Sequence, residues 1–311
     1  MTEASHLRPL VSVSIPTYNG ELRIGEAIRS LQAQQYPHME IIVSDNASTD
    51  NTETVMSQFM AEDERIRYFR HPENLGIPRN FEFGLQQAKG KYFIWLSDDD
   101  HLLPGVLSRY VDFLEAQPDF SMVSGAIDYT ENGEIVSQET NIDLQQSSGA
   151  SRCLEYYARV KEGGMYYGMM RRDLGQQLTV GPTIGSDWHF VAGLAFLGKI
   201  KILDFVGYSK SRGGVSNDFR DYARSYGESA IWGYLPFVKI GLDAAAEILY
   251  RAKVYRKHNG ISRLITGLGA CFLVLGHYYG ITVPRMAAGW ILRRLNIKTL
   301  RQRSLEKVKL D

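Results

Sequence analysis

The sequence has few cysteines and no excess of charge of either sign. Its 311 residues include only Cys153 and Cys271, which lie far apart and form no disulfide framework. Such cysteine usage is typical of a reducing compartment, so we expect the catalytic part to be cytoplasmic. Lys and Arg equal Asp and Glu at 35 each, so the total charge gives no indication of a nucleic-acid partner.

An apolar leader and a dinucleotide fingerprint are also missing. The first ten residues contain no apolar run, so we do not expect a cleaved secretory signal. No Gly-x-Gly-x-x-Gly follows the first predicted strand, which argues against a redox enzyme that binds a dinucleotide. The chain is 44% hydrophobic, which is enough to bury a substantial core.

Strand and helix patterns alternate regularly over the first third of the chain. Apolar runs at 10–15, 40–44, 66–69 and 92–96 predict strands, and amphipathic patterns between them predict helices. This alternation favours an α/β fold with a mostly parallel sheet, in which ligands bind beyond the carboxyl ends of the strands. After residue 121 the pattern loosens into shorter strand-like pieces.

Helix starts are predicted from two local signals. Asp50 with Glu53 has the spacing of a capping box, and Pro104 has the place of a first-turn proline.

Three adjacent carboxylates, Asp98, Asp99 and Asp100, directly follow the fourth predicted strand. Like charges at contact distance raise one another's pKa unless a cation compensates them. Mg²⁺ or Mn²⁺ would do so, and such ions prefer one or two carboxylates together with phosphate oxygens. The alternative is a solvated acidic loop whose last residue caps the helix after Pro104.

Four ordered motifs cover about the first 110 residues. They are VSVSIPTYNG at 11–20, IIVSDNASTDNT at 41–52, NLGIPRN at 74–80 and AKGKYFIWLSDDD at 88–100. Together they resemble the family 2 glycosyltransferases, bacterial surface-polysaccharide enzymes among them. The resemblance implies the GT-A fold, a Rossmann-like and mostly parallel sheet flanked by helices. It also implies a catalytic domain over 1–225, with a nucleotide-binding half to about residue 110 and an acceptor half after it.

The resemblance assigns nucleotide and metal roles at the strand ends. Asp98 is expected near the ribose, Asp99 on a Mn²⁺ or Mg²⁺ that bridges the diphosphate, and Asp100 in support of that metal. Ser97 stands where many relatives have an aspartate, so the metal prediction depends mainly on Asp99. The alternatives are a plain turn at 16–20, an Asx-turn at Asp45 and an exposed Arg79 at a helix start. The residues expected around the nucleotide are Pro16, Thr17, Tyr18, Asn19, Asp45, Arg79 and Asp98.

The resemblance also assigns a base to the segment Gly185 to Phe190. Inverting transfer requires a group that takes the proton of the acceptor hydroxyl, and Asp187 is the candidate. Ser186 replaces the acid that usually precedes it. The alternative is that Ser186 or Asp187 only caps the helix that follows, and Trp188 either flanks the sugar or packs in the core.

The end of the chain is basic and partly apolar. From Arg251 onward the sequence contains thirteen Lys and Arg but only two acidic residues, and residues 264–284 contain no Asp, Glu, Lys or Arg. We therefore predict a helical extension over 226–311 that binds the inner face of the cytoplasmic membrane peripherally. The alternative is a helical hairpin that packs on the catalytic domain or forms a homodimer interface.

The predicted function is that of a metal-dependent, inverting glycosyltransferase. A UDP-type or dTDP-type nucleotide sugar would be the donor, and a saccharide, expected to be lipid-linked, the acceptor. One alternative is a sugar-nucleotide pyrophosphorylase, although its Gly-x-Gly-Thr-Arg type of loop does not follow the first strand. The other is a non-catalytic scaffold that binds a nucleotide sugar.

Overall fold

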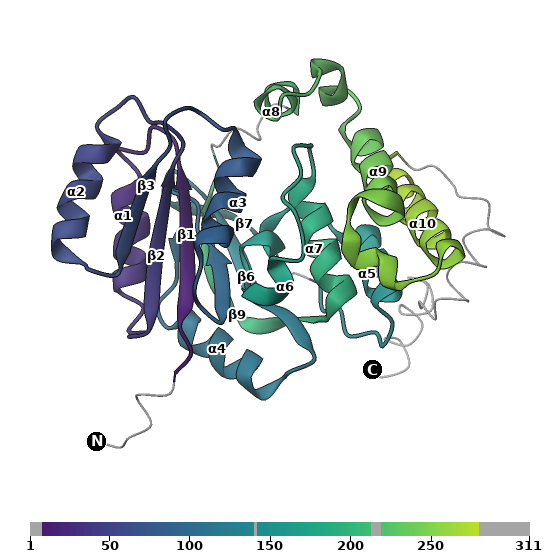
Figure 1. Cartoon of the computed structure of the whole chain (residues 1–311), viewed down its shortest axis with the longest axis horizontal. Helices are drawn as coiled ribbons and strands as arrows, with labels where there is room; N and C mark the ends of the chain where they lie inside the picture. Colours follow the sequence, from purple (N-terminus) through teal and green to yellow (C-terminus); the bar gives the residue numbers. More distant parts are fainter. Residues whose placement is uncertain (1–7, 140–141, 213–218, 280–311) are drawn as a thin grey trace.

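Strands and helices alternate along the chain, as the sequence predicts (Figure 1). The computed structural model describes residues 8–139, 142–212 and 219–279. Its strands are β1 (Val11–Thr17), β2 (Met39–Asp45), β3 (Ile66–Arg70), β4 (Tyr92–Trp95), β5 (His101–Leu102), β6 (Phe120–Glu131), β7 (Glu134–Glu139), β8 (Met169–Arg171) and β9 (Lys199–Ser211). Its α-helices are α1 (Ile24–Gln32), α2 (Thr52–Glu62), α3 (Ile77–Gln87), α4 (Val106–Ala116), α5 (Gly149–Arg159), α6 (Arg172–Gly175), α7 (Ser186–Leu197), α8 (Phe219–Ser225), α9 (Pro236–Ala246) and α10 (Gly260–Tyr279). Shorter helical turns are η2 (Gly164–Tyr167), η4 (Ala230–Gly233), η5 (Glu247–Arg251) and η6 (Lys253–Lys257).

One mixed sheet runs through the molecule in the order β3-β2-β1-β4-β8-β6-β9-β5, and β7 pairs with β6. β1 to β4 are parallel where they pair. β8 is antiparallel to both β4 and β6, and β9 is parallel to β6, so β9 runs in the same direction as β4. The carboxyl ends of β1, β2, β4 and β9 therefore lie at one edge. We call this edge, which follows Thr17, Asp45, Trp95 and Ser211, the strand-end rim.

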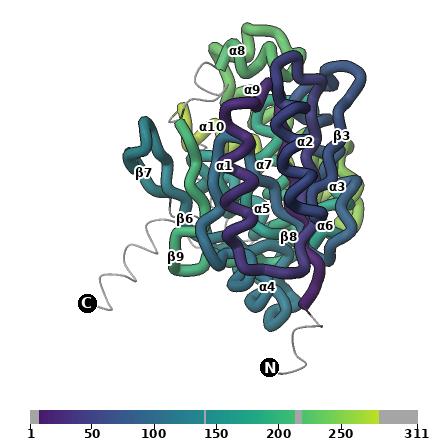
Figure 2. The backbone as a smooth tube through the Cα atoms, turned by 90° about the vertical axis from the view of Figure 1, so that its left-hand side faces the viewer, coloured from purple at the N-terminus to yellow at the C-terminus, as the bar shows by residue number. Residues whose placement is uncertain are grey.

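Alternate side chains of the strands enter two separate cores. On β4, Tyr92 and Ile94 join α1, α2 and α4, whereas Phe93 and Trp95 join α3, α5 and α7. This period-two pattern is that of strands buried on both faces. α3 lies especially close to β1, because a Cβ at Gly84 would collide with Ser14. The two faces of the sheet are thus covered by different helices, and α1 and α2 lie on the same side in Figure 2.

Local details differ from the predicted helix starts and strand lengths. Asn51, not Asp50, occupies the N-cap of α2, and Asp50 instead accepts from the Thr52 backbone N–H at 3.1 Å. Gly105 is the N-cap of α4, so Pro104 lies before the helix. Short strands are predicted after residue 121, and β7 and β8 are short, with 6 and 3 residues. β6 and β9 are longer than predicted, with 12 and 13 residues. In β6, apolar and polar residues alternate from Ile127 to Thr130, which obscures its length in the sequence.

The helices after residue 225 share a core with the acceptor half. Ile240, Ala244 and Val274 belong to the same buried cluster as Trp95 and Phe190. The helical prediction for this region is confirmed where the structure describes it, and residues 280–311 lie outside the described part. Among the described residues, only α10 is long and apolar enough to cross a membrane, with a mean hydropathy of 1.4.

Candidate active site

The loops after β1, β2 and β4 are tied together at the strand-end rim. Thr17 Oγ1 donates to Asp98 Oδ2 at 2.6 Å, which links the first strand to the aspartate cluster. The Asn19 N–H donates to Ser48 Oγ at 2.8 Å, and the Asn46 N–H donates to Thr17 O at 2.9 Å. Asn19 has a positive φ of 52°, which turns the chain back toward the second loop. Three motifs distant in sequence therefore meet in space.

The predicted nucleotide residues occupy different environments at this rim. Asp45 is fully buried, and its carboxylate accepts from the Ser48 N–H at 2.8 Å and from Tyr68 Oη at 2.5 Å. Asp45 therefore orders the loop after β2. Pro16 is buried, whereas Tyr18 is 45% exposed and Arg79 is exposed in the first turn of α3. A role for each of them toward a nucleotide stays a prediction.

The three aspartates have different partners. Asp98 also accepts from Arg23 at 3.2 Å. Asp100 is fully buried and accepts from Tyr208 Oη at 3.0 Å and from the Ser211 N–H at 2.8 Å, so β9 holds it in place. Among the described residues, no other side chain forms a hydrogen bond with the Asp99 carboxylate. Asp99 is thus the carboxylate of the three whose oxygens are left for a ligand.

Asp99 fits the chemistry of a metal ligand. Burial and the charges of Asp100 and Asp98 together raise the pKa of its carboxyl to about 6, against the opposing charge of Lys210. A divalent cation would remove this excess of negative charge. No cluster of three or more His, Cys, Asp or Glu side chains suited to a metal occurs in the described ranges. A single carboxylate completed by phosphate oxygens and water is a common arrangement for Mg²⁺.

Lys210, near the end of β9, is a partly buried cation beside the aspartates. Its Nζ lies 3.4 Å from Asp100 Oδ2 and 4.3 Å from the centroid of the Tyr167 ring. Burial by itself lowers the pKa of Lys210, but Tyr167, Asp100 and Asp99 raise it above the ordinary value. The lysine therefore stays charged beside the aspartates.

Asp187 lies in the first turn of α7. Gly185, with a φ of 76°, is the N-cap and no side chain caps the helix, so the alternative that Ser186 or Asp187 acts only as a cap is wrong. Burial raises the pKa of the Asp187 carboxyl to about 6, although the Trp188 N–H and the charge of Lys210 act in the opposite direction. The carboxylate packs against Gly163, where a Cβ would collide with Oδ2. A partly buried carboxyl with this pKa has the properties of a general base.

Trp188 and the two histidines considered as metal ligands contact other residues of the protein. Trp188 is buried and stacks near Phe237 and Tyr278, at centroid distances of 6.2 and 5.8 Å, so it packs in the core. His189 Nδ1 pairs with Tyr157 Oη at 2.9 Å, and His101 Nε2 lies 3.1 Å from Glu26. Each ring therefore has a partner outside the three aspartates.

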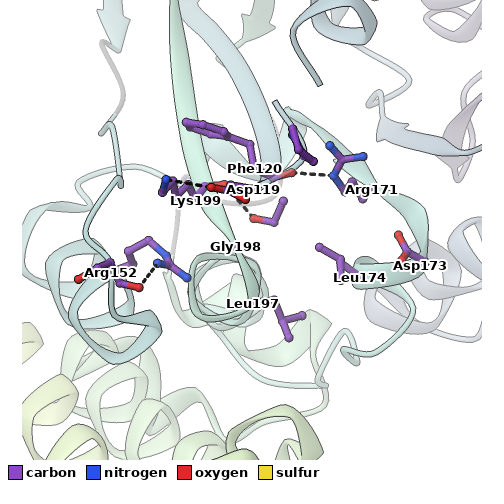
Figure 3. Close-up of a pocket in the computed structure, with 12 residues that line it drawn as sticks. Asp119, Phe120, Arg152, Arg171, Asp173, Leu174, Leu197, Gly198 and Lys199 are labelled. Atoms are coloured by element: carbon purple, nitrogen blue, oxygen red, sulfur yellow. Dashed lines mark hydrogen bonds and ion pairs between the residues drawn. The ribbon is translucent and has the colours of Figure 1, made fainter. Parts of the chain in front are cut away.

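A pocket of about 550 Å³ opens at the opposite edge of the sheet (Figure 3). It lies at the starts of β6 and β9, and its two arginines satisfy helix ends. Arg171 donates to Leu114 O at 2.7 Å, and Arg152 donates to Ala195 O at 2.6 Å. Because these guanidinium groups are occupied by carbonyl groups, the pocket is explained by helix capping and not by a ligand.

Comparison with known proteins shows which family shares these features. The sequence model of "Glycosyl transferase family 2" matches residues 12–177, which include β1 to β4, the aspartate cluster and α5. The chain belongs to glycosyltransferase family 2. Family 2 membership makes this protein a glycosyltransferase and confirms the predicted recognition and enzyme class. It also decides against the pyrophosphorylase alternative.

Two curated relatives of this family 2 glycosyltransferase have more specific names. The GalNAc(5)-diNAcBac-PP-undecaprenol beta-1,3-glucosyltransferase of Campylobacter jejuni is 31% identical over 167 residues, which are 53% of this chain and 53% of that protein. The putative teichuronic acid biosynthesis glycosyltransferase TuaG of Bacillus subtilis is 35% identical over 107 residues, which are 34% of this chain and 42% of that protein. The chain thus spans about half the length of the first relative and less of the second.

Solved structures confirm the fold. S. aureus TarS 1-349 in complex with UDP-GlcNAc is 19% identical with a TM-score of 0.59, covering 92% of this chain and 80% of that chain. The mannosyltransferase PcManGT from Pyrobaculum calidifontis, in complex with GDP-Man and Mn²⁺, is 16% identical with a TM-score of 0.56, covering 98% and 81%. The predicted GT-A architecture is therefore confirmed for this family 2 enzyme.

Three site residues were not predicted from the sequence. Arg23 contacts Asp98, Lys210 contacts Asp100, and Gly163 supports Asp187. The sequence contains one signal for Lys210. Tyr208 and Lys210 are two residues apart on one strand, so their side chains lie on the same face, and both contact Asp100. The glycine-containing segment 211–217 lies mostly outside the described residues. Within it Arg212 is described, and its guanidinium donates to Ser137 Oγ at 2.9 Å.

Proposed function

We propose that this glycosyltransferase moves a sugar from a UDP-type or dTDP-type nucleotide sugar to an acceptor hydroxyl, with inversion at the anomeric carbon. One observation carries the proposal: Lys210, whose Nζ lies 3.4 Å from Asp100 Oδ2, acts electrostatically on both Asp99 and Asp187 and opposes the rise in the pKa of each. Both carboxylates are therefore within the electrostatic reach of one cation. Inverting transfer needs this arrangement, with a diphosphate site and a base on two sides of the sugar.

The strand-end rim supports the nucleotide. The exposed Tyr18 ring can cover the face of a pyrimidine, and Thr17 positions Asp98 for the ribose. Arg79 supplies an exposed cation for a phosphate at the start of α3. The complex of TarS with UDP-GlcNAc supports a uridine donor for a relative of the same fold.

Asp99 would hold Mn²⁺ or Mg²⁺ together with diphosphate oxygens, and Asp100 would keep Lys210 beside it. When bound, the ion would act as a Lewis acid that stabilises the negative charge of the leaving diphosphate. The Mn²⁺ that accompanies GDP-Man in PcManGT supports this proposal. Lys210 adds a fixed positive charge at the same place.

Asp187 would act as the base. Its carboxylate takes the proton of the acceptor hydroxyl while the hydroxyl oxygen forms a bond to the anomeric carbon. The bond between that carbon and the diphosphate oxygen breaks on the opposite side, and its electron pair leaves with the nucleotide diphosphate. The partly buried position of Asp187 limits the access of bulk water to this step.

The acceptor would be a lipid-linked saccharide used for a bacterial surface polysaccharide. The name of the Campylobacter relative contains such an acceptor, and TuaG is named for teichuronic acid. A lipid-linked acceptor implies peripheral attachment at the inner face of the cytoplasmic membrane. The basic C-terminal region supports this location.

Calorimetry tests the donor site. UDP, dTDP, GDP and CMP are titrated with and without Mn²⁺ into the wild type, Asp99→Asn and the control Asp119→Asn. Asp119 is exposed at the opposite edge of the sheet. We expect UDP or dTDP to bind only with Mn²⁺, and binding to be lost in Asp99→Asn alone. Binding of no nucleotide under any condition would overturn the proposal.

Transfer assays on the wild type and on Asp187→Asn distinguish an enzyme from a scaffold without turnover. The enzyme loses transfer and keeps donor binding, whereas a scaffold shows no transfer in the wild type either. The stereochemistry of the product, read from the anomeric proton coupling in NMR, tests inversion independently.

A further inference from the structure

The helices α9 and α10 with η5 and η6 carry an exposed surface without acidic side chains. Fourteen residues between 236 and 279 are exposed, and none of them is Asp or Glu. Seven are apolar or aromatic and four are basic. We call this surface the outer face, and its residues of these two kinds are Leu242, Tyr250, Ile261, Leu264, Leu268, Phe272, Tyr279, Arg251, Lys253, Arg256 and Lys257.

The apolar residues of α10 form one stripe. Ile261, Leu264, Leu268 and Phe272 follow one another at intervals of three and four, so they lie on one side of the helix. Their exposed fractions are 73%, 48%, 45% and 42%. Only 28% of the most apolar part of α10 is buried in the protein. A continuous apolar stripe on the surface marks a site of interaction.

The opposite side of α10 packs on protein. A Cβ at Gly267 would lie 3.1 Å from Leu249 and 3.3 Å from Ala245 O, so the helix backbone approaches α9 and η5 closely. Ala270 and Val274 are fully buried. Crossing a bilayer would strip α10 of these contacts. The helix can therefore meet a membrane only along its outer face, in the membrane plane.

We propose that the outer face docks α10 on an anionic lipid bilayer. Lys253, Arg256 and Lys257 are exposed in η6, directly before the apolar stripe begins. This pairing of basic and apolar side chains is complementary to phosphate headgroups and the acyl boundary beneath them. A second copy of this chain would bring the same basic residues together, which disfavours a dimer at this face.

The outer face is connected to the candidate active site. Tyr278 near the end of α10 stacks on Phe237 at 3.5 Å and 7°, and both rings lie near Trp188, the neighbour of Asp187. α9 and α10 lie side by side at one end of the molecule, far from α2 (Figure 1). Docking would hold Asp187 near the membrane surface, where a lipid-linked acceptor is found. This consequence, unlike the docking itself, rests on the proposed function.

Vesicle co-sedimentation of the full chain tests the docking. The vesicles contain phosphatidylcholine with phosphatidylglycerol, or phosphatidylcholine alone. We expect the wild type to bind the anionic vesicles, with a loss of tenfold or more in Leu268→Glu/Phe272→Glu. The control Met60→Glu adds a charge at a site on α2 that is 38% exposed, and should bind like the wild type. In Lys253→Gln/Arg256→Gln/Lys257→Gln we expect a loss on the order of 100-fold.

Further outcomes would overturn the proposal. Absence of wild-type binding to both vesicles excludes docking, and an equal loss in Met60→Glu excludes the outer face. Light scattering that shows a dimer dissociated by Leu268→Glu/Phe272→Glu would assign the face to a second copy. Donor calorimetry on the same variants distinguishes the two proposals. Vesicle binding without donor binding overturns the proposed function alone, and donor binding without vesicle binding overturns the docking alone.

Discussion

Lys210 Nζ lies 3.4 Å from Asp100 Oδ2, and the aspartate is fully buried. This pair joins β9, in the second half of the chain, to the aspartates that follow β4. It supplies a protein cation where the family resemblance predicts only carboxylates and a metal. Asp100 is therefore occupied by β9, and Asp99 is left for the metal and the diphosphate.

Lys210→Met should leave Asp100 buried without its cation. Loss of one partner of a buried ion pair is strongly destabilising, and we expect the free energy of unfolding to fall on the order of 3 kcal/mol. Donor binding should weaken tenfold or more. The control Lys199→Met removes a partly exposed lysine from the other end of β9, whose partner Asp119 is 73% exposed, and the change should be below about 0.5 kcal/mol. Denaturant unfolding and calorimetry measure both; equal stability of the two variants would contradict the expectation.

Asp187→Asn should lower kcat by a factor on the order of 10² to 10⁴ and leave donor affinity unchanged, because general base catalysis contributes about that much. The pH profile is a separate test. Only the deprotonated carboxylate takes a proton, and its pKa is raised to about 6. We therefore expect kcat to be full well above pH 6 and to fall as the pH drops through about 6. A wild-type kcat that is independent of pH between 5 and 8 would contradict this role.

Gly163→Ala should displace the base without touching the donor site. The added Cβ would collide with Asp187 Oδ2. Displacement of a reacting group by about 1 Å can cost on the order of 100-fold in rate, so kcat should fall by about that factor. The control Gly181→Ala, whose Cβ would meet only Thr183 at 3.7 Å, should keep kcat. Initial rates and donor calorimetry measure both variants, and a loss of donor affinity in Gly163→Ala would count against a local effect.

Asp243→Asn should weaken the attachment of α9. Asp243 is buried, accepts from Thr183 and Lys239, and accepts from Arg251 at 2.9 Å. Its neutral replacement removes the buried charge that Lys239 and Arg251 share and leaves them only Glu228 and Glu247 as acidic partners, so we expect a loss on the order of 3 kcal/mol in the free energy of unfolding. Asp221→Asn, which breaks the exposed pair with Arg224, should change stability by less than about 0.5 kcal/mol. Urea unfolding of both variants compares them directly.

The donor half could be predicted from the sequence because its signals are local. The amphipathic pattern after the first strand predicts a helix, and its apolar residues Ile24, Ala27, Ile28 and Leu31 are the buried face of α1. Strands that are buried on both faces appear in the sequence as apolar runs, and the polar residues that directly follow them lie at the strand-end rim. Asp98 to Asp100 were placed in this way.

The partners of the site residues could not be predicted in the same way. Lys210 reaches Asp100 only because β8 runs antiparallel between β4 and β6 and so directs β9 toward the same rim. Gly163 meets Asp187 across 23 residues of intervening chain through packing alone. Such contacts depend on tertiary topology, which neither periodicity nor spacing contains. The C-terminal helices illustrate a further limit. The sequence presents membrane binding and protein packing as alternatives, whereas in the structure one side of α10 packs on protein and the other side is exposed.

The shared core of the acceptor half and the C-terminal helices limits how this enzyme can be recombined with relatives. Trp95 and Phe190 lie in one buried cluster with Ile240 and Val274, so the inner side chains of α9 and α10 are fitted to α5 and α7. A chimera that imports only residues 226–279 from another enzyme would bring a mismatched surface into this cluster. Exchange of acceptor preference is expected to succeed when α5, α7, α9 and α10 are transferred as one unit onto an unchanged donor half.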